Sequence, residues 1–288
     1  MAFDLRASTG RPLVKPPPFD YIRPNTLAEG LELIGKYGAD ARILAGGQSL
    51  IAMLNMRVAA PKLLIDINGL TDEAYIRDDG DAIAIGCATR QAVLERWPTL
   101  AQRLPLIAKA LPYVGHAQTR SRGTVCGSIA HADPSSELPL CLALLDGQVV
   151  LRNRRRSRTV PARDFFSGVL QTTRLDDEMI TEIRLPVPPG NTGAAFNEMA
   201  IRHGDFAIIA VGALVDTTHV RVAIGGGDDF PVVKRLPLSG EAALQEALND
   251  LAWSLDCQDD LHATATYRRH LIRVLGQRTI EEAIACRS

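Results

Sequence analysis

The chain has 288 residues, which suggests two domains, and its 46% apolar and 23% charged residues exclude a disordered or fibrous protein. Lys and Arg total 32 against 33 Asp and Glu, so the net charge of −1 provides no basic excess for binding nucleic acid. There is no apolar run of about 18 residues, and residues 1–18 lack the apolar centre of a secretory signal. We therefore expect a cytoplasmic protein with no transmembrane segment.

The first part of the chain reads as two helices alternating with two strands. Residues 1–18 are predicted to be a flexible arm, because they are polar and end in three prolines. A helix is expected from Leu27, and strands are expected at 41–44 and 63–67. A glycine turn and a short helix over 49–57 connect these two strands.

From about residue 71 the pattern changes to strands and helices separated by stronger turn signals. These elements are predicted as a strand at 82–85, helices at 104–114 and 138–145, and a hairpin over 149–160. Residues 186–190 are proline-rich and resemble a linker. Beyond this linker the sequence predicts strands at 196–199, 207–215 and 220–224. Two helices, at 242–251 and 266–275, follow these strands.

The five cysteines are scattered, and none belongs to a CxxC pair. This distribution is typical of reduced thiols and provides no local framework for zinc or an iron–sulfur cluster. The six histidines also lack metal-ligand spacing, and His131 is interpreted as structural or as a neighbour of a bound cofactor. We predict no metal site in this chain.

The segment Ala45-Gly46-Gly47-Gln48-Ser49 lies between a predicted strand and a predicted helix. Glycine allows the main chain to approach a phosphate closely, and the amides at the start of a helix favour an anion. The segment is neither a Walker loop nor the GxGxxG of a Rossmann fold. A plain tight turn remains an alternative interpretation of this motif.

Residues 120–139 combine small residues with polar side chains. Thr124, Ser128, Ser136 and Glu137 could form hydrogen bonds with the hydroxyl or phosphate oxygens of an extended ligand. A solvent-exposed loop is the alternative, although Val125 and its neighbours are rather apolar for one.

Taken together, these motifs and several others resemble the FAD-binding subunits of molybdenum hydroxylases. The family includes the medium subunit of carbon monoxide dehydrogenase and the FAD domain of xanthine dehydrogenase. The resemblance covers roughly residues 19–288. The matching segments are 45–51 with Arg57, 122–134, Val160-Pro161-Ala162-Arg163-Asp164-Phe165-Phe166, Ile183-Arg184-Leu185-Pro186, Arg202-His203-Gly204-Asp205-Phe206-Ala207 and Tyr267-Arg268-Arg269-His270-Leu271.

The resemblance implies an α+β fold with a two-lobed PCMH-type FAD-binding domain over 19–190, whose lobes cover about 19–70 and 71–190. A smaller α+β domain, like the C-terminal domain of the carbon monoxide dehydrogenase flavoprotein, would follow over 191–288. The turn at 45–49 would hold the pyrophosphate of FAD, and 124–128 would supply amides and hydroxyls. Glu137 corresponds to an acidic residue that binds the cofactor in relatives. The implied FAD-binding residues are Leu44, Ala45, Gly46, Gly47, Gln48, Ser49, Leu50, Ile51, Thr124, Val125, Cys126, Gly127, Ser128, Glu137, Ile180 and Asn197.

The chain departs from the family pattern at four positions. Cys126 stands where many relatives have glycine, and its side chain would act as a small hydrophobe or as a redox-sensitive thiol. Ala52 replaces a frequent proline, Asn55 a frequent lysine, and Asn197 a lysine found in some relatives.

The function implied by the resemblance is electron transfer. FAD would accept electrons from a [2Fe–2S] small subunit, the molybdopterin large subunit would oxidise the substrate, and the three chains would form a dimer of heterotrimers. No protein acid or base is assigned, because the redox chemistry belongs to the cofactor. A flavin-free scaffold subunit and a stand-alone FAD oxidase are the alternatives.

Two further motifs are interpreted separately from this resemblance. Arg152, Arg154, Arg155, Arg156 and Arg158 are the densest basic cluster, which could be a solvated turn or a docking patch for a partner subunit or anionic acceptor. The three glycines at 225–227 are interpreted as a turn at a strand end.

Overall fold

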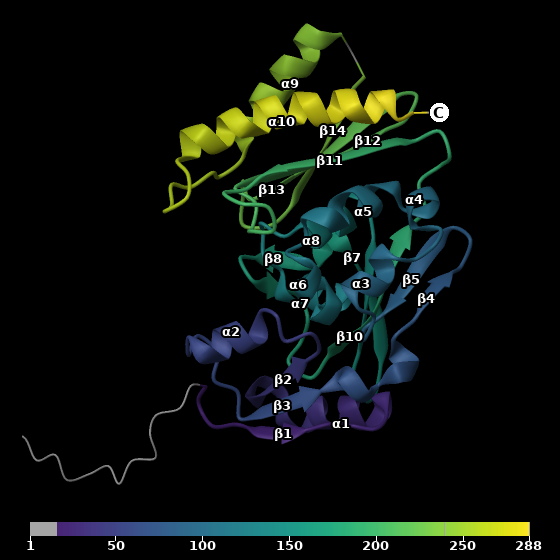
Figure 1. Cartoon of the computed structure of the whole chain (residues 1–288), viewed down its shortest axis with the longest axis vertical. Helices are drawn as coiled ribbons and strands as arrows, with labels where there is room; N and C mark the ends of the chain where they lie inside the picture. Colours follow the sequence, from purple (N-terminus) through teal and green to yellow (C-terminus); the bar gives the residue numbers. More distant parts are fainter. Residues whose placement is uncertain (1–15, 239, 288) are drawn as a thin grey trace, which may run out of the picture.

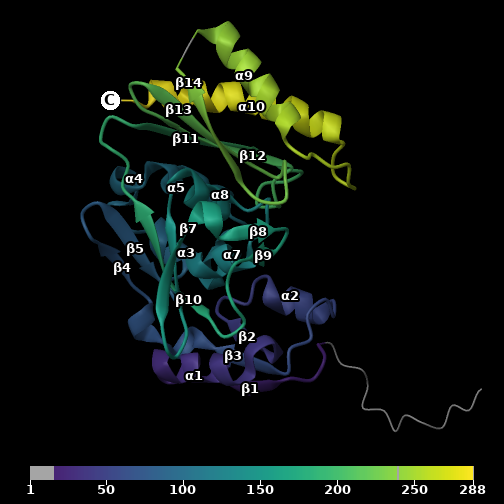
Figure 2. The same cartoon turned by 180° about the vertical axis from the view of Figure 1, so that it is seen from behind.

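The computed structural model describes residues 16–238 and 240–287, which form two lobes and a C-terminal unit (Figure 1). The second lobe lies between the other two parts, and the view from behind shows the same order (Figure 2). Most of the predicted N-terminal arm, residues 1–18, lies outside the described residues. Within these described ranges, no helix is both long and apolar enough to cross a membrane.

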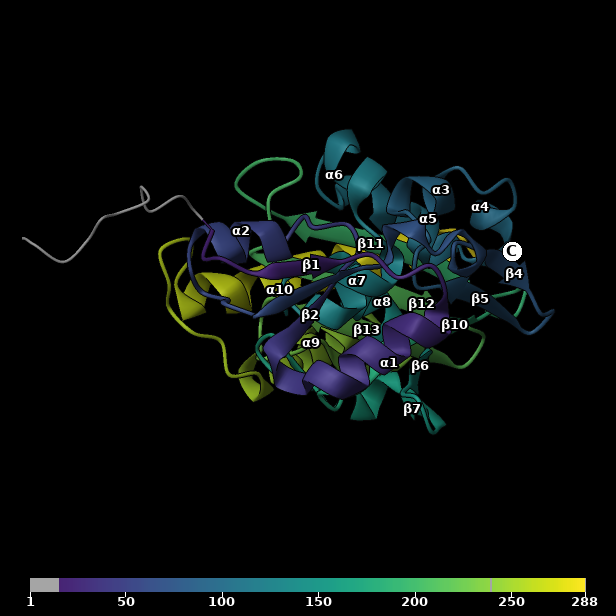
Figure 3. The ribbon, with the colours of Figure 1, turned by 90° about the horizontal axis from the view of Figure 1, so that it is seen from below.

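The first lobe is a parallel three-stranded sheet in the order β1-β3-β2. Its elements are β1 (Asp20–Ile22), α1 (Leu27–Tyr37), β2 (Ala41–Leu44), α2 (Leu50–Asn55) and β3 (Leu63–Asp66). α1 begins at a reciprocal cap, in which the Glu29 amide donates to Thr26 Oγ1 and the Asn25 amide donates to the Glu29 carboxylate. Seen from below, β1, β2 and α1 lie in front of the second lobe (Figure 3). The predicted order of helix, strand, glycine turn, helix and strand is confirmed.

The second lobe is built on an antiparallel five-stranded sheet in the order β4-β5-β10-β6-β7. The strands are β4 (Ile76–Asp78), β5 (Ala82–Gly86), β6 (Gln148–Arg152), β7 (Ser157–Pro161) and β10 (Met179–Pro186), and a separate hairpin is formed by β8 (Phe166–Gly168) and β9 (Gln171–Thr172). The helices are α3 (Gln91–Glu95), α4 (Leu100–Arg103), α5 (Pro105–Ala110), α6 (Ala117–Arg122), α7 (Val125–His131) and α8 (Glu137–Leu144).

Three helices of this lobe can be compared with the predictions made from the sequence. The helix predicted over 104–114 is interrupted, because α5 ends at Ala110 and a 3₁₀ turn containing Pro112 follows. The segment around 120–131 is helical, and α7 begins at Thr124, whose hydroxyl accepts a hydrogen bond from the Gly127 amide. Every residue of α8 is buried, because this helix lies between the second lobe and the C-terminal unit.

The C-terminal unit is an antiparallel four-stranded meander in the order β11-β12-β13-β14. Its elements are β11 (Gly193–Met199), β12 (Ile209–Val215), β13 (His219–Gly225), β14 (Val232–Pro237), α9 (Glu241–Ser254) and α10 (Ala265–Ala285). α10 covers one face of the sheet, while α5 and α8 pack against the other, so every residue of β12 is buried. β14 was not predicted, because Lys234 and Arg235 interrupt the apolar pattern of this edge strand.

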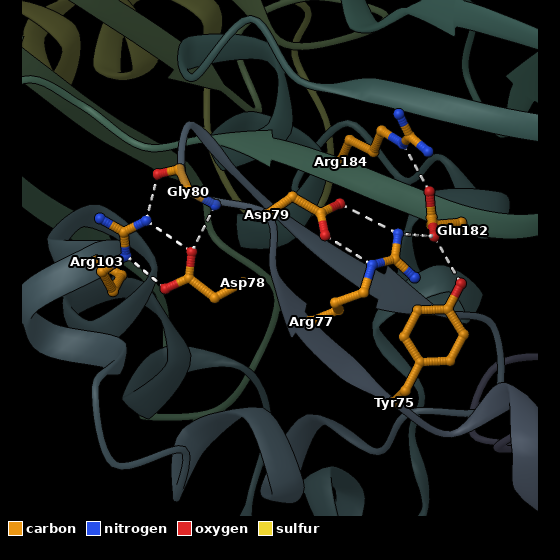
Figure 4. A network of polar contacts seen from close by, with 8 residues as sticks. All are labelled: Tyr75, Arg77, Asp78, Asp79, Gly80, Arg103, Glu182 and Arg184. Atoms are coloured by element: carbon orange, nitrogen blue, oxygen red, sulfur yellow. Dashed lines mark hydrogen bonds and ion pairs between the residues drawn. The ribbon is translucent and has the colours of Figure 1, made fainter.

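A polar network connects the edge strand β4 of the second lobe to its central strand β10 (Figure 4). The Glu182 carboxylate, 7% exposed, accepts hydrogen bonds from the Tyr75 hydroxyl at 2.6 Å, Arg184 Nε at 2.6 Å and Arg77 at 3.2 Å. Burial alone would raise the pKa of Glu182, but the hydrogen bonds from Tyr75 and Arg184 hold this pKa below its ordinary value. The carboxylate is therefore ionised at neutral pH and joins β4 to β10.

We expect Tyr75→Phe to lower the free energy of unfolding by about 1.5 kcal/mol, because a hydrogen bond to a charged, buried acceptor is lost. Urea denaturation of the purified protein measures this change. Tyr37→Phe is the matched control, since the Tyr37 ring contacts Lys36 and its hydroxyl forms no hydrogen bond with a residue in the described ranges. Equal stabilities for the two variants would contradict the role given to Tyr75.

Candidate cofactor site

A cavity of about 750 Å³ lies where the two lobes and the C-terminal unit meet. The first lobe contributes the glycine turn before α2, and the second contributes α7, the start of α8, the β8–β9 hairpin and the start of β10. The loop after β11 contributes Gly204, Asp205 and Phe206. A large ligand bound here would therefore contact all three parts of the chain.

The two glycine-bearing segments found in the sequence are in direct contact. A Cβ atom on Gly46 would lie 2.6 Å from both the carbonyl oxygen of Arg122 and the Cα of Gly123. Gly47 has a φ of +71°, a left-handed conformation that favours glycine. Both glycines are thus required, one for the close approach of two main chains and the other for the shape of the turn.

The second segment is held by its own side chains and by α3. Thr124 is 3% exposed and caps α7 through the Gly127 amide at 3.1 Å. The Gln91 amide donates to the Gly123 carbonyl at 2.9 Å, and the Val125 amide donates to the Thr89 carbonyl at 3.0 Å. The segment therefore presents Thr124, Gly127 and Ser128 to the cavity in a defined conformation.

Most of the predicted binding residues line this cavity. Those that do are Ala45, Gly46, Gly47, Gln48, Ser49, Leu50, Thr124, Cys126, Gly127, Ser128, Glu137 and Ile180. Leu44 and Ile51 support the turn from behind, because a Cβ on Gly47 would lie 3.3 Å from one side chain and 3.2 Å from the other. Val125 is 1% exposed and packs in the core.

The structure does not bring Asn197 to the cavity. Its side-chain amide donates to Thr279 Oγ1 at 3.2 Å and to the Glu282 carboxylate at 2.7 Å, both on α10. Successive side chains of a strand point to opposite faces, so the neighbouring Glu198 points to the face covered by α5 and α8 instead. Residues 194–196 are all apolar and are followed by two polar residues, so the sequence carried no alternation that could have revealed this orientation.

Several cavity-lining residues were missed by sequence reasoning. Leu170, at the tip of the β8–β9 hairpin, has a φ of +55° and lines the cavity. Such a conformation is rare for a bulky residue and marks a locally strained position. Arg42 and Arg174 also line the cavity, and their mutual repulsion adds to burial in lowering the pKa of Arg174. An anionic group between these two cations would relieve that repulsion, but nothing in the sequence pattern paired them.

Glu137 is one of three acidic residues that line this cavity, together with Glu178 and Asp205. It is 5% exposed, and burial raises the pKa of its carboxyl to about 7. His131, at the end of α7, also lines the cavity, and burial lowers the pKa of this imidazole. Near pH 7 the Glu137 carboxyl is therefore about half protonated, while the His131 imidazole is mainly neutral.

Cys126 is a buried thiol. It is 3% exposed, its Sγ lies 3.7 Å from the carbonyl oxygen of Ile85, and burial raises its pKa well above the ordinary value. Of the two roles expected for Cys126, the structure supports the small hydrophobe.

We expect a thiol reagent to modify Cys286 rapidly in the folded protein, because this cysteine is exposed while the other four are buried. Iodoacetamide labelling followed by peptide mass spectrometry measures each site, and a parallel reaction in urea gives the fully labelled control. Rapid labelling of Cys126 in the folded protein would contradict its burial.

This arrangement defines a binding protein for a large, phosphate-bearing cofactor. Residues 17–188 match the family described as "FAD binding domain in molybdopterin dehydrogenase" and residues 194–283 match the "CO dehydrogenase flavoprotein C-terminal domain". The chain therefore belongs to the FAD-binding subunits of the molybdopterin dehydrogenases, a class of oxidoreductases, and its cofactor is FAD.

Individual proteins support this assignment. The 6-hydroxypseudooxynicotine dehydrogenase complex subunit alpha of Paenarthrobacter nicotinovorans is 34% identical, over 94% of this chain and 96% of that one. The carbon monoxide dehydrogenase medium chain of Hydrogenophaga pseudoflava is 32% identical, over 94% and 98%. A solved structure of carbon monoxide dehydrogenase from the same organism matches with a TM-score of 0.90 at 30% identity, covering 96% of this chain and 100% of that one. The predicted α+β fold class is confirmed.

The residues present fit FAD. Gly46 packs against the main chain of residues 122–123, so two stretches of main chain form one wall of the cavity. There is no room at this contact for a Cβ atom on residue 46. Main-chain amides and the hydroxyls of Thr124 and Ser128 are suitable donors for phosphate and ribityl oxygens, and Ile180 adds an apolar surface. FAD itself supplies the one- and two-electron redox chemistry.

Proposed function

We propose that this chain is the electron-transfer subunit of a heterotrimeric molybdenum hydroxylase. Its FAD accepts electrons from a [2Fe–2S] small subunit, while a molybdopterin large subunit oxidises the organic substrate. The FAD then passes the electrons to an external acceptor. The observation that supports this proposal is the joining of two glycine-bearing turns at a cavity, in a chain of the FAD-binding family.

The proposal also includes the arrangement of the complex and of the chain. Two heterotrimers associate in the cytoplasm. The FAD-binding domain covers 19–190, with lobes of about 19–70 and 71–190, and the C-terminal domain covers 191–288. The proposed FAD contacts are the predicted residues that line the cavity, with Leu44 and Ile51 behind them.

The names of the relatives support a separation of substrate chemistry from this chain. They include medium or other subunits of carbon monoxide dehydrogenase, nicotine 6-hydroxylase and caffeine dehydrogenase. Substrates so unlike each other are difficult to reconcile with one substrate pocket in a shared flavin subunit. We infer that the substrate is bound on another chain.

The test is to purify the chain together with its co-expressed neighbouring gene products. We expect a visible flavin spectrum, release of FAD on denaturation, and bleaching of the flavin by the complex's substrate only when the partner subunits are present. An intact complex without flavin would favour a scaffold subunit. Flavin bleaching by a small substrate in the isolated chain would favour a stand-alone oxidase.

A further inference from the structure

The carbonyl group of Arg122 lies at the junction of the two lobes, beside the cofactor cavity. Arg122 is the last residue of α6, and the following Gly123 lines the cavity. From the first lobe, Gly46 approaches this carbonyl so closely that a Cβ on Gly46 would lie 2.6 Å from the oxygen. From the second lobe, the guanidinium of Arg90 donates a hydrogen bond to the same oxygen. One main-chain group therefore contacts both the glycine turn and a charged side chain.

Arg90 also reaches back to the first lobe. A second nitrogen of its guanidinium donates to the side-chain oxygen of Asn68, which lies in the 3₁₀ turn after β3. Asn68 in turn donates to the Asp66 carboxylate, both from its side-chain nitrogen and from its main-chain amide, the latter at 2.8 Å. An amide side chain that donates to an anion through its nitrogen can accept from a cation through its oxygen. The Asn68 side chain therefore links the positive Arg90 to the negative Asp66.

Asp66 connects this link to the glycine turn. It is 6% exposed and also accepts a hydrogen bond from the Tyr21 hydroxyl of β1. Burial would raise the pKa of Asp66, but hydrogen bonds from Tyr21 and Asn68 hold this pKa below its ordinary value, so the carboxylate is ionised at neutral pH. Asp66 ends β3 and is paired in register with Leu44, the last residue of β2. Because the glycine turn directly follows Leu44, its position depends on Asp66.

These contacts form a closed cycle around the junction of the lobes. The cycle runs from the glycine turn through the paired ends of β2 and β3 to Asn68. It continues through the Arg90 guanidinium to the Arg122 carbonyl, and it returns to the turn at Gly46. The side chain of Arg90 is the part of this cycle that spans from one lobe to the other by hydrogen bonds.

The main chain of Arg90 is held independently of its side chain. Arg90 forms an antiparallel β-bridge with Thr124, and hydrogen bonds of 2.9 and 3.0 Å join the main chain of residues 89 and 91 to that of residues 123 and 125. Arg90 is half-buried and lies outside the lining of the cavity. A change confined to its guanidinium would therefore leave the segment 123–125 in place and remove the link to the first lobe.

We propose that Arg90 is a positioning residue for FAD, which holds the two lobes together at the cofactor site without touching the cofactor. This inference rests on the proposed function, because it takes the turn at 45–49 and the segment 122–128 as two halves of the FAD site. The guanidinium joins Asn68, beside the first half, to the carbonyl of Arg122 in the second. FAD then meets two main-chain segments whose separation is already set, so its binding loses less free energy to ordering them.

The experiment uses the purified complex after removal of FAD and measures the rebinding of FAD by flavin fluorescence. Arg90→Met should raise the dissociation constant at least about fivefold, because the two halves of the site are no longer held at a fixed separation. Arg90→Lys keeps the charge but loses the planar fork that reaches two acceptors, so its loss should be intermediate.

Hydrogen–deuterium exchange of the FAD-free complex provides a second readout. The amides of Ile51 and Met53 donate to carbonyl groups of the glycine turn, at 3.1 and 3.0 Å. Both amides should exchange faster in Arg90→Met than in the wild type, because the turn has lost its link to the second lobe. A residue that supported only the second lobe would leave the exchange of these two amides unchanged.

Arg103→Met is the matched control. The Arg103 guanidinium also joins separate elements, because it donates to the Asp78 carboxylate at 2.7 and 2.8 Å and to the Gly80 carbonyl, but it lies outside the cavity lining (Figure 4). It should lower the free energy of unfolding and leave both the affinity for FAD and the exchange of the turn unchanged. Equal effects of Arg103→Met and Arg90→Met on FAD affinity would contradict a specific role of Arg90.

If Arg90→Met does not fold, Asn68→Ala tests the same link from the first lobe, since it leaves the hydrogen bond between Arg90 and Arg122 intact. Wild-type affinity and wild-type exchange in Asn68→Ala and in every folded Arg90 variant would overturn the inference. Absence of FAD from the wild-type complex, or full FAD content in Gly46→Val, would instead overturn the proposed function or the proposed site.

Discussion

Gly46→Val is expected to leave the protein folded but to weaken FAD binding at least about tenfold, which corresponds to about 1.4 kcal/mol. The main chain at Gly46 lies directly against the main chain of residues 122–123. A Cβ at this position would therefore lie 2.6 Å from both the Arg122 carbonyl oxygen and the Gly123 Cα. Backbone on both sides cannot move away as a flexible side chain could. The turn must therefore shift, which would move its amides away from the phosphates in the proposed mode of FAD binding.

The measurement is the amount of FAD released per chain, together with the dissociation constant from flavin fluorescence. Gly46→Ala places the same Cβ with less bulk and should show a smaller loss in the same direction. Gly35→Ala is the matched control, because no described residue outside the adjacent backbone of its own helix lies within 4 Å of the added Cβ, and alanine favours a helix interior. Full FAD content in Gly46→Val would show that the pyrophosphate is not held by this turn.

Arg158→Met is expected to destabilise the protein by about 3 kcal/mol at neutral pH. Arg158 donates to both oxygens of Glu178, at 2.8 and 2.7 Å, and the Glu178 side chain is only 1% exposed. The remaining partner of this carboxylate is the Leu175 amide at 2.9 Å. Removing Arg158 therefore leaves a buried negative charge without an ion-pair partner among the described residues, and only the more distant Arg156 and Arg174 still act on it.

The loss in Arg158→Met should depend on pH. The hydrogen bond from Arg158 holds the pKa of Glu178 below its ordinary value. Stability from this pair is therefore fully present above the unfolded pKa of about 4.3 and disappears as the pH falls through the lower folded pKa. Urea denaturation at neutral and at acid pH measures the difference between variant and wild type, which should shrink in acid.

Arg155→Met is the matched control within the same cluster, because the side chain of Arg155 is exposed and forms no ion pair with any described residue. It should change the free energy of unfolding by less than about 0.5 kcal/mol. Similar losses in both variants would contradict the structural role of Arg158, and Glu178→Gln combined with Arg158→Met should recover part of the loss. The cluster thus divides into Arg158, which supports the cavity wall, and Arg154, Arg155 and Arg156, which border an open groove beside α1.

The sequence by itself determined the family, the cofactor and most of the cavity wall. Segments 45–51 and 122–134 carry their own geometry, because glycine conformation and helix capping act between residues close in the chain. The regular spacing of apolar residues likewise predicted most strands and helices, because the residues on the buried face of each element recur at a fixed interval in the sequence.

Only the tertiary structure decided which way individual side chains point and what they meet. Asn197 faces α10 while Glu198 points to the opposite face of the sheet, and this depends on the packing of β11 between elements far away in the sequence. Cys126 is a buried thiol because it lies against Ile85 of β5, and Arg158 is structural because Glu178 lies across the sheet. Burial and charge pairing come from such distant neighbours, so the local sequence pattern could not reveal them.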